Sequence, residues 1–393
     1  MTSRYPYRTT PLAALLALTL GCSDAAETEK SDCKEQSGHA CVWLGTGAEG
    51  FNGDGRHRLD TDIYWSMDLA FGSDDTAWFI DWNNHLIRRV LADDTVVSVV
   101  GWTDPIFPGD GTGDASEGKP EGADGALVKL NHPTELQLAE DGAMLVMAWH
   151  NHKLRRIDPE TSRVTILAGA GPGFAGDEEP LAKCRFKQPK ALAADSEGNL
   201  YVGDQQNFRV RRIDAEGVLT TIVGVGTQGS EGDGGPASMA QLNWEIGSNP
   251  EPSGGLAVAD GMLYIADTLS HRLRVVDLAE GTIDAFAGTG EQGYSGDGGS
   301  AREATFNHPR ELEIGPDGSL YVADTDNHVI RAIDLESGEV RTVVGTGEPG
   351  IDSEDGKLAT ETRLDRPFGL EFDADGNLYV MDTLNSRILK VTK

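Results

Sequence analysis

The sequence predicts an all-β fold built from six similar units. A block recurs six times along the chain, and each copy holds an apolar strand, a polar turn and a strand of mixed basic and apolar residues. Aligned on the residue after the apolar strand, the copies fall at Asp81, Ala148, Asp204, Asp267, Asp324 and Asp382. The intervals of 56 to 67 residues suit one four-stranded sheet with its turns. No copy shows a sustained helical period.

The fifth copy shows the four strands directly. They are predicted at residues 311–314, 320–323, 329–333 and 340–344, where β-branched and aromatic residues are frequent and polar turns separate the segments. The other copies repeat this order. Six units of four short antiparallel strands predict a six-bladed β-propeller.

The two ends of the chain predict how the ring closes. The last copy stops after its third strand, residues 387–391, and lacks a fourth. Near the N-terminus, residues 41–47 match the ends of the fourth strands at 285–290 and 343–347. We therefore expect the N-terminal strand to complete the last blade, which removes an exposed sheet edge. The propeller is predicted to span residues 41–393.

The first residues have the features of an export signal. Arg4 and Arg8 precede an apolar run at 12–18 that is too short to cross a bilayer. The run ends in Leu18-Thr19-Leu20-Gly21-Cys22, which resembles a bacterial lipoprotein box with Cys22 as the lipidated residue. We expect a lipoprotein-type signal peptide at 1–21 and a polar tether at 22–40, with plain secretion as the alternative. The protein would then be exported and lipid-anchored at the cell envelope, on the periplasmic side or at the cell surface.

Cysteine usage agrees with an oxidising compartment. With Cys22 acylated, Cys33 and Cys41 are close enough in sequence to form a disulfide that pins the tether to the closing strand. Cys184 would remain unpaired. The spacings of Cys and His do not match a structural zinc site.

Charge limits the partners. The formal net charge is −31 at pH 7, from 64 acidic and 33 basic side chains. Such a field repels a phosphate backbone, so nucleic acid is excluded as a partner. The acids can serve solubility alone, or they can attract a basic partner or a divalent cation. The loop acids Asp54, Asp233 and Asp297 are possible calcium ligands. No cofactor is assigned, and we expect a monomer.

Two sequence strings resemble the NHL-repeat family of propellers. They are residues 324–331, Asp-Thr-Asp-Asn-His-Val-Ile-Arg, and residues 293–299, Gly-Tyr-Ser-Gly-Asp-Gly-Gly, followed by Asn-His-Pro at 307–309. The family includes lyases, lactonase-like relatives, sensor domains and binding modules, so the resemblance implies the fold more than an activity. Two copies depart from the pattern. Ala148 replaces the Asp of the second copy, and Phe208 replaces the His of the third.

One face of the ring should carry most of the unusual residues. The chain changes ends once per strand, so the connections from fourth to first strands and the turns from second to third strands emerge on the same face. This loop-rich face includes two long insertions, residues 102–130, which begin with Trp102, and residues 244–250. Their apolar side chains could form a recognition rim, or they could pack onto neighbouring blades.

The inner strands supply a candidate site in the central channel. The second copy reads Asn-His-Pro-Thr-Glu at 131–135 and the fifth reads Asn-His-Pro-Arg-Glu at 307–311, three blades apart. Glu135 and Glu311 should therefore face each other across the channel. Opposed carboxylates with basic neighbours could hold a cation, bind a polar ligand or perform acid-base chemistry, or they could simply be solvated. The candidate ligand-binding residues are Glu135, Glu311, Arg310, Lys190, His132, His308, Asp68 and Trp102.

A second group of histidines recurs with the fold. His85, His152, His271 and His328 occupy the same turn in four copies, and we expect them to fix that turn by hydrogen bonding.

The sequence thus predicts a cell-envelope binding or scaffolding module. It would recognise a protein or a small polar ligand on the loop-rich face, and no catalytic residue is assigned. The alternative is a metal-assisted propeller enzyme, a lyase or a hydrolase, that uses the channel carboxylates and histidines.

Overall fold

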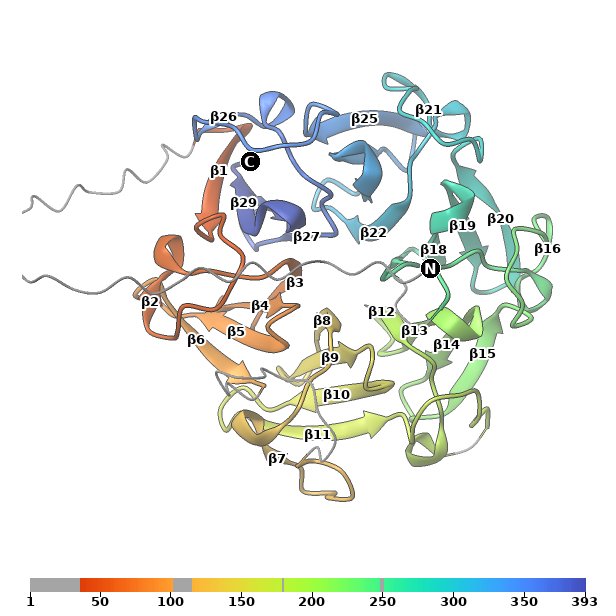
Figure 1. The fold of residues 1–393 in the computed structure, drawn as a ribbon. Coiled ribbons are helices and arrows are strands. Elements are labelled where there is room, and N and C mark those ends of the chain that lie inside the picture. Colours follow the sequence, from red (N-terminus) through yellow and green to blue (C-terminus); the bar gives the residue numbers. More distant parts are fainter. Residues whose placement is uncertain (1–35, 102–114, 179, 248–250) are drawn as a thin grey trace, which may run out of the picture. The chain divides into compact units, whose positions relative to one another are not determined.

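The structure, a computed structural model, describes residues 36–101, 115–178, 180–247 and 251–393. These residues belong to one compact unit, Cys33–Lys393. They form six antiparallel sheets arranged as the blades of a propeller (Figure 1), so the predicted six-bladed fold is confirmed. Contacts between neighbouring inner strands run round the whole ring, including a contact between the first and the last blade.

Each blade runs from an inner strand at the channel to an outer strand at the rim. Blade 1 contains β3 (Ser66–Phe71), β4 (Ala77–Asp81), β5 (Leu86–Val90) and β6 (Thr95–Val100). Blade 2 contains β8 (Pro133–Leu138), β9 (Met144–Ala148), β10 (Lys153–Ile157) and β11 (Arg163–Ala168). Blade 3 contains β12 (Pro189–Ala194), β13 (Leu200–Asp204), β14 (Arg209–Ile213) and β15 (Leu219–Val223).

The second half of the ring repeats this plan. Blade 4 contains β17 (Leu256–Ala259), β18 (Met262–Asp267), β19 (Arg272–Asp277) and β20 (Thr282–Ala287). Blade 5 contains β22 (Pro309–Ile314), β23 (Leu320–Asp324), β24 (Val329–Ile333) and β25 (Glu339–Val344). Blade 6 contains β27 (Gly369–Phe372), β28 (Leu378–Asp382) and β29 (Arg387–Val391), and β1 (His39–Leu44) is its fourth strand.

The N-terminal strand closes the ring as the sequence predicts. β1 pairs antiparallel with β29, with Ala40 opposite Val391 and Val42 opposite Leu389. In Figure 1, β1 lies beside β29, next to the C-terminus. Leu44 at the end of β1 is fully buried. Pairing the first strand with the last sheet satisfies backbone groups that would otherwise form an open edge.

The four-stranded prediction is incomplete at the rim. Five blades carry an additional two-residue strand outside the fourth strand in the described part of the chain. These strands are β2 (Arg56–His57), β7 (Ala123–Asp124), β16 (Gly235–Pro236), β21 (Gly299–Ser300) and β26 (Lys357–Leu358). Blade 3 has a single bridge, between Pro180 and Val218, at the same place. A two-residue strand gives no detectable sequence period, so the pattern alone did not reveal it.

Helical structure in the described residues is confined to single 3-10 turns. One group follows the rim segments and comprises η1 (Arg58–Asp60), η2 (Gly125–Leu127), η3 (Leu181–Lys183), η5 (Ala237–Met239), η7 (Ala301–Glu303) and η9 (Ala359–Glu361). The other group joins the second and third strands of blades 3 to 6 and comprises η4 (Gln205–Asn207), η6 (Thr268–Ser270), η8 (Thr325–Asn327) and η10 (Thr383–Asn385).

A buried aspartate at the end of the second strand anchors most blades. In blade 5, Asp324 accepts hydrogen bonds from the backbone N–H of Asn307 at 2.7 Å and from the Asn327 amide at 2.8 Å. It also lies 3.5 Å from the fully buried guanidinium of Arg331. Blade 2 has Ala148 at this position, and there Asn151 accepts the corresponding backbone N–H, that of Asn131, at 2.9 Å.

The recurrent turn histidines link neighbouring blades, which supports the role expected for them. Each adopts a positive φ of 50° to 59° and accepts a backbone N–H of the next blade at Nδ1, at 3.0 to 3.3 Å. These residues are His85, His152, His271 and His328, and their donors are His132, Gln188, His308 and Arg366. The neutral imidazole is required, because a protonated Nδ1 cannot accept a hydrogen bond.

Candidate functional site

The channel carboxylates predicted from the sequence do meet at the ring axis. Lys190 Nζ lies 3.1 Å from Glu135 Oε2 and also bonds to Glu311 Oε2, so one ammonium bridges the two opposed carboxylates. It also donates to the backbone oxygen of Arg310 at 3.4 Å. Asp68 from blade 1 lines the same cavity. The three ion-paired side chains are at most 7 % exposed, so this network is shielded from solvent.

The strands that supply the network share a local irregularity. The pairing of β12 with β13 shifts register between Pro189 and Ala191, and the same shift occurs before Glu135 in β8 and before Glu311 in β22. In blade 4 the corresponding inward position is Gly255. A Cβ there would lie 2.4 Å from the Arg310 backbone oxygen, so glycine permits close approach of β17 and β22.

Two further carboxylates in the cavity were missed from the sequence. Glu313 and Glu371 line it one layer below Glu311, nearer the ends of β22 and β27. Alternation along β22 could have predicted Glu313, because residues two apart on a strand share a face. Burial, and then repulsion from Glu311 and Asp68, raises the pKa of Glu313 to about 8.

The pKa values of three other channel acids are raised as well. Burial, followed by the nearby Glu311 carboxylate, raises the pKa of Asp68 and of Glu135 well above their usual values, although Lys190 offsets part of the effect on Glu135. Burial and Glu313 raise the pKa of Glu371. Burial is the main common cause, and repulsion between neighbouring carboxylates adds to it.

Arg310 and His308 lie outside this cavity. The Arg310 guanidinium donates to the Glu251 carboxylate and to the Pro252 backbone oxygen. His308 pairs with Asp326 at 2.7 Å between Nδ1 and Oδ2. Arg366 joins the two acids by binding both Glu251 and Asp326. The basic groups on this side of the loop-rich face are therefore already engaged by acids.

His132 belongs to an aromatic cluster on the opposite side of the loop-rich face. Trp65 and Trp82 stack with ring centroids 6.0 Å apart and planes 17° apart. Trp82 contacts His132, with centroids 4.4 Å apart, and His132 contacts His150 at 5.0 Å. His150 stacks on the buried Trp149 at 4.1 Å. We call Trp65, Trp82, His132 and His150 the aromatic platform.

The platform occupies positions where other blades keep a structural residue. The residue after the anchoring aspartate is a threonine in blades 4 to 6, and its hydroxyl donates to a backbone oxygen of the next inner strand at 2.8 to 2.9 Å. Those residues are Thr268, Thr325 and Thr383. Blades 1 and 2 have Trp82 and Trp149 instead. Aligning this position across the six copies would have revealed the cluster from the sequence.

The platform is partly open to solvent, since Trp65 and Trp82 remain partly exposed. The Trp82 indole Nε1 is buried without a hydrogen-bond partner in the described part of the structure. Trp65 has φ 63°, and a positive φ recurs at the equivalent positions His132, Gln188, His308 and Arg366, so this conformation belongs to the repeat. Partly exposed indoles beside an unsatisfied donor are a feature expected of a binding surface rather than of a core.

His132 is neutral at physiological pH. Burial, with the neighbouring His85 and His150, lowers its pKa to about 2. Its Nε2 lies 3.2 Å from the Asn83 amide oxygen, and its Nδ1 lies 2.8 Å from that of Asn131. Side-chain amides and imidazoles therefore lie beside the indoles, and the Glu49 carboxylate accepts the Trp65 Nε1–H at 3.0 Å.

Several predicted residues cannot be placed in the site. Trp102, Cys22 and Cys33 lie outside the described residues. Cys41 is disulfide-bonded, and its pairing with Cys33 stays a prediction. Cys184 is a buried free thiol. Trp244, in the second insertion, is fully buried and donates to the Ala266 backbone oxygen at 2.9 Å, so it packs onto its blade.

Two observations concern metal binding and membrane spans in the described ranges, whereas the lipid anchor at Cys22 lies outside them and stays a prediction. No group of three or more His, Cys, Asp or Glu side chains there has an arrangement suited to a metal ion. The loop acids considered for calcium instead pair with buried arginines, namely Asp54 with Arg88, Asp233 with Arg274 and Asp297 with Arg331. Across the same residues, no helix has the length and apolar character needed to cross a membrane.

Comparison with known proteins agrees with the repeat pattern. The family model of the Teneurin NHL domain matches residues 256–350. The chain is 29 % identical over 278 residues to Protein SUPPRESSOR OF QUENCHING 1, chloroplastic, of Arabidopsis thaliana, which covers 68 % of this chain and 25 % of that protein. It is 28 % identical over 286 residues to NHL repeat-containing protein 2 of Bos taurus, which covers 65 % of this chain and 37 % of the relative. The chain thus spans well under half the length of these relatives.

Solved structures show the same architecture. An auxiliary nutrient binding protein from Bacteroides thetaiotaomicron superposes with a TM-score of 0.63 at 16 % identity, over 91 % of this chain and 76 % of that one. At this identity the similarity establishes the fold alone. The ring of six blades defines a β-propeller, and the family model and the relatives support an NHL-repeat β-propeller.

Proposed function

We propose that this propeller is a binding module whose loop-rich face recognises a neutral, polyhydroxylated ligand such as an oligosaccharide. The observation that carries the proposal is the aromatic platform, where blade 1 has Trp82 at a position that holds a structural threonine in blades 4 to 6. Departures from a repeat pattern are expected at functional sites.

The chemistry of the platform selects this ligand class. Near-parallel indoles stack on the flat, apolar faces of sugar rings, and the amides of Asn83 and Asn131 can satisfy hydroxyl groups at their edges. His132 stays neutral, and the Glu49 carboxylate beside the platform already accepts the Trp65 indole N–H, which favours a neutral ligand over a charged one. On the far side of the face, Arg310 and Arg366 are already paired with acids.

The experiment is a calorimetric titration of the full chain with three neutral oligosaccharides, namely maltopentaose, cellopentaose and mannopentaose. Trp82→Ala should reduce affinity at least tenfold for any sugar that binds, because a stacked aromatic side chain is lost. Trp43→Ala is the matched control, since Trp43 packs on Tyr379 beside a groove that is lined by different residues. Equal loss in both variants, or no binding by the native chain across the panel, would reject the proposal.

We further propose that the module acts outside the cytoplasm. The support is the sequence of residues 1–22, which resembles a lipoprotein signal with Cys22 as the acylated residue. An auxiliary nutrient binding protein among the similar folds is consistent with capture of a nutrient or partner at the cell envelope. Cys22→Ser should release the protein from the membrane fraction and abolish labelling by a fatty-acid analogue. Unchanged labelling would contradict the lipid anchor.

The enzymatic alternative is a metal-assisted lyase or hydrolase. The described site favours binding over this alternative, because Glu135 and Glu311 are engaged with Lys190 and the histidines at 132 and 308 contact Trp82 and Asp326 instead.

A further inference from the structure

The channel contains a cavity that is separate from the aromatic platform. Its volume is about 280 Å³, and it lies on the ring axis. Its lining reaches the ends of the inner strands, with Leu138, Ala194, Ile314 and Phe372 each the last residue of its strand. The ion-paired Lys190, Glu135 and Glu311 lie nearer the starts of their strands, toward the loop-rich face. The cavity therefore extends toward the face opposite the platform.

The cavity holds more negative charge than the described part of the chain balances. Its lining carries the carboxylates of Asp68, Glu135, Glu311, Glu313 and Glu371. Lys190 supplies one ammonium, which is occupied by Glu135 and Glu311. The three other carboxylates form no ion pair with a described Lys, Arg or His. Buried carboxylates without a counter-ion are costly, and they either retain protons or attract a cation.

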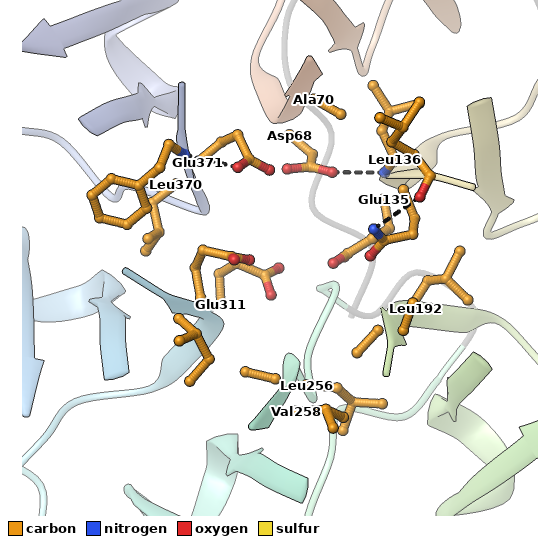
Figure 2. Close-up of a pocket in the computed structure, with 18 of the residues that line it drawn as sticks. Asp68, Ala70, Glu135, Leu136, Leu192, Leu256, Val258, Glu311, Leu370 and Glu371 are labelled. Carbon is orange, nitrogen blue, oxygen red and sulfur yellow. Dashed lines mark hydrogen bonds between the residues drawn. The ribbon is translucent and has the colours of Figure 1, made fainter. Parts of the chain in front are cut away.

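Asp68 shows this imbalance most clearly. It is only 6 % exposed, and its carboxylate accepts the Leu136 backbone N–H at 2.6 Å. Figure 2 shows the carboxylates of Asp68 and Glu371 pointing toward each other across the upper part of the cavity. Glu371 accepts the Phe372 backbone N–H at 2.8 Å. Backbone amides orient both acids, yet no cationic side chain described by the structure lies between them.

The opposite wall of the cavity is apolar. Leu192 from β12 and Leu256 and Val258 from β17 lie across from the acids in Figure 2, and blade 4 contributes no charged side chain to the lining. A ligand that satisfies both walls has a cationic head and an aliphatic body. The volume is below the range of about 300–1,000 Å³ that is usual for drug-sized ligands, which favours a small molecule.

We propose that this cavity is a second binding site and takes a small aliphatic amine in its cationic form. The ammonium group lies among Asp68, Glu313 and Glu371, and the alkyl chain lies against Leu192, Leu256 and Val258. The Lys190 side chain is itself an ammonium on an alkyl chain, and two carboxylates of the same cavity bind it. An aliphatic amine would bind to the other carboxylates in the same way. The site goes beyond the proposed function, because it uses none of the platform residues.

The test compares n-pentylamine with 1-pentanol on the full chain at pH 7.5, by calorimetry and thermal unfolding. We expect saturable binding of the amine and a rise in Tm, since a ligand that binds only the native state stabilises it. 1-Pentanol, which lacks the charge, should cause neither. Equal effects of the two probes, or no binding of the amine, would overturn the proposal. A Tm increase with calcium chloride and none with the amine would also overturn it.

Substitutions test whether the amine binds at this cavity or to the acidic protein in general. Asp68→Asn and Glu371→Gln should each weaken amine binding at least tenfold, whereas Glu197→Gln, at an exposed position, should leave it unchanged. Trp82→Ala should not alter amine binding, so failure of the oligosaccharide proposal can be told apart from failure of this one. If a channel variant does not fold, the comparison of amine and alcohol on the native chain still decides.

Protons should compete with the amine. The charged groups facing the ligand are Asp68 of β3, Glu135 of β8, Lys190 of β12, Glu311 and Glu313 of β22, and Glu371 of β27. Because burial raises the pKa of most of these acids, lowering the pH from 8 to 5 neutralises carboxylates while the amine stays charged. Affinity should therefore fall at least tenfold over this interval, and pH-independent binding would contradict the proposed contacts.

Discussion

Replacing Lys190 with methionine is the sharpest test of the channel network. The substitution keeps a side chain of similar length but removes the ammonium that joins Glu135 to Glu311. The three side chains are 2 %, 7 % and 4 % exposed, respectively, so solvent cannot replace the lost partner. Removing one member of a buried ion pair costs about 3–5 kcal/mol of unfolding free energy, because it leaves uncompensated buried charge. Methionine nearly conserves the volume and adds little to this cost.

The loss of unfolding free energy caused by Lys190→Met should increase as pH rises. A carboxyl whose folded-state pKa is raised stabilises the fold fully below its unfolded value of about 4.3, and this stability is lost as pH rises through the folded pKa. Lys190 lowers the pKa of Glu135 against the effect of burial, so removing it raises that pKa further. The difference between native and variant chains should therefore be small near pH 4.5 and reach about 3–5 kcal/mol at pH 7.5.

The assay is urea unfolding of both chains at pH 4.5, 6.0 and 7.5, followed by circular dichroism. Lys187→Met is the matched control, because Lys187 is exposed and only three residues away. It should change the unfolding free energy by less than about 0.5 kcal/mol at every pH. The network as described would be refuted if the unfolding free energy of Lys190→Met were within about 1 kcal/mol of the native value at pH 7.5. It would also be refuted if the difference between the two chains increased as pH is lowered.

Substitutions at three further residues test the structure around the site by the same unfolding assay. His152→Asn should cost about 1 kcal/mol at neutral pH, where the Nδ1 bond is lost, and less toward pH 4.5. Burial lowers the pKa of His152 to about 4, so the stability that the neutral histidine contributes is lost as pH falls from about 6.5 through that value. A difference in unfolding free energy between native chain and variant that does not change with pH would contradict this role. Leu44→Ala, in the closing strand, should cost about 2–5 kcal/mol, and a negligible cost would argue against closure by β1. Asp324→Ala should cost about 3–5 kcal/mol because it removes one acid from the buried Arg331. Asp324→Asn keeps a hydrogen-bond acceptor and should cost less. Equal costs of the two variants would exclude the charge as the cause.

The fold could be predicted because the same local sequence signals recur along the chain. Strand alternation, turn residues and the missing fourth strand after residue 391 together predict six blades and their closure by the N-terminal strand. Each signal is reinforced by several copies. The two-residue rim strands escaped prediction because they are shorter than any sequence period.

The channel was only partly predictable. Ring geometry places Glu135 opposite Glu311 once the blades are counted, and both do reach the axis. The direct bridge by Lys190 is a tertiary contact between β12, β8 and β22, which no sequence pattern indicates. Arg310 has the corresponding position in blade 5, yet it turns to Glu251, a residue distant in sequence whose placement depends on the tertiary fold.

The aromatic platform could not be recognised from a single copy. Trp65 and Trp82 contact each other across a connection, and His132 comes from the next blade. Only comparison of equivalent positions shows that Trp82 stands where blades 4 to 6 have threonine. The positive φ of Trp65 recurs at the equivalent positions of other blades, so it does not mark the platform either.

The most direct measurement of ligand recognition at the platform uses the indole N–H groups themselves. Full chain labelled with ¹⁵N in its tryptophans would be titrated with the oligosaccharide panel, with indole resonances assigned from single Trp→Phe variants. We predict that the Trp82 and Trp65 indole signals shift in a saturable way, while those of Trp43 and the buried Trp78 stay in place. Shifts confined to Trp43 or Trp78, or an unchanged spectrum with every sugar, would contradict ligand recognition by the platform.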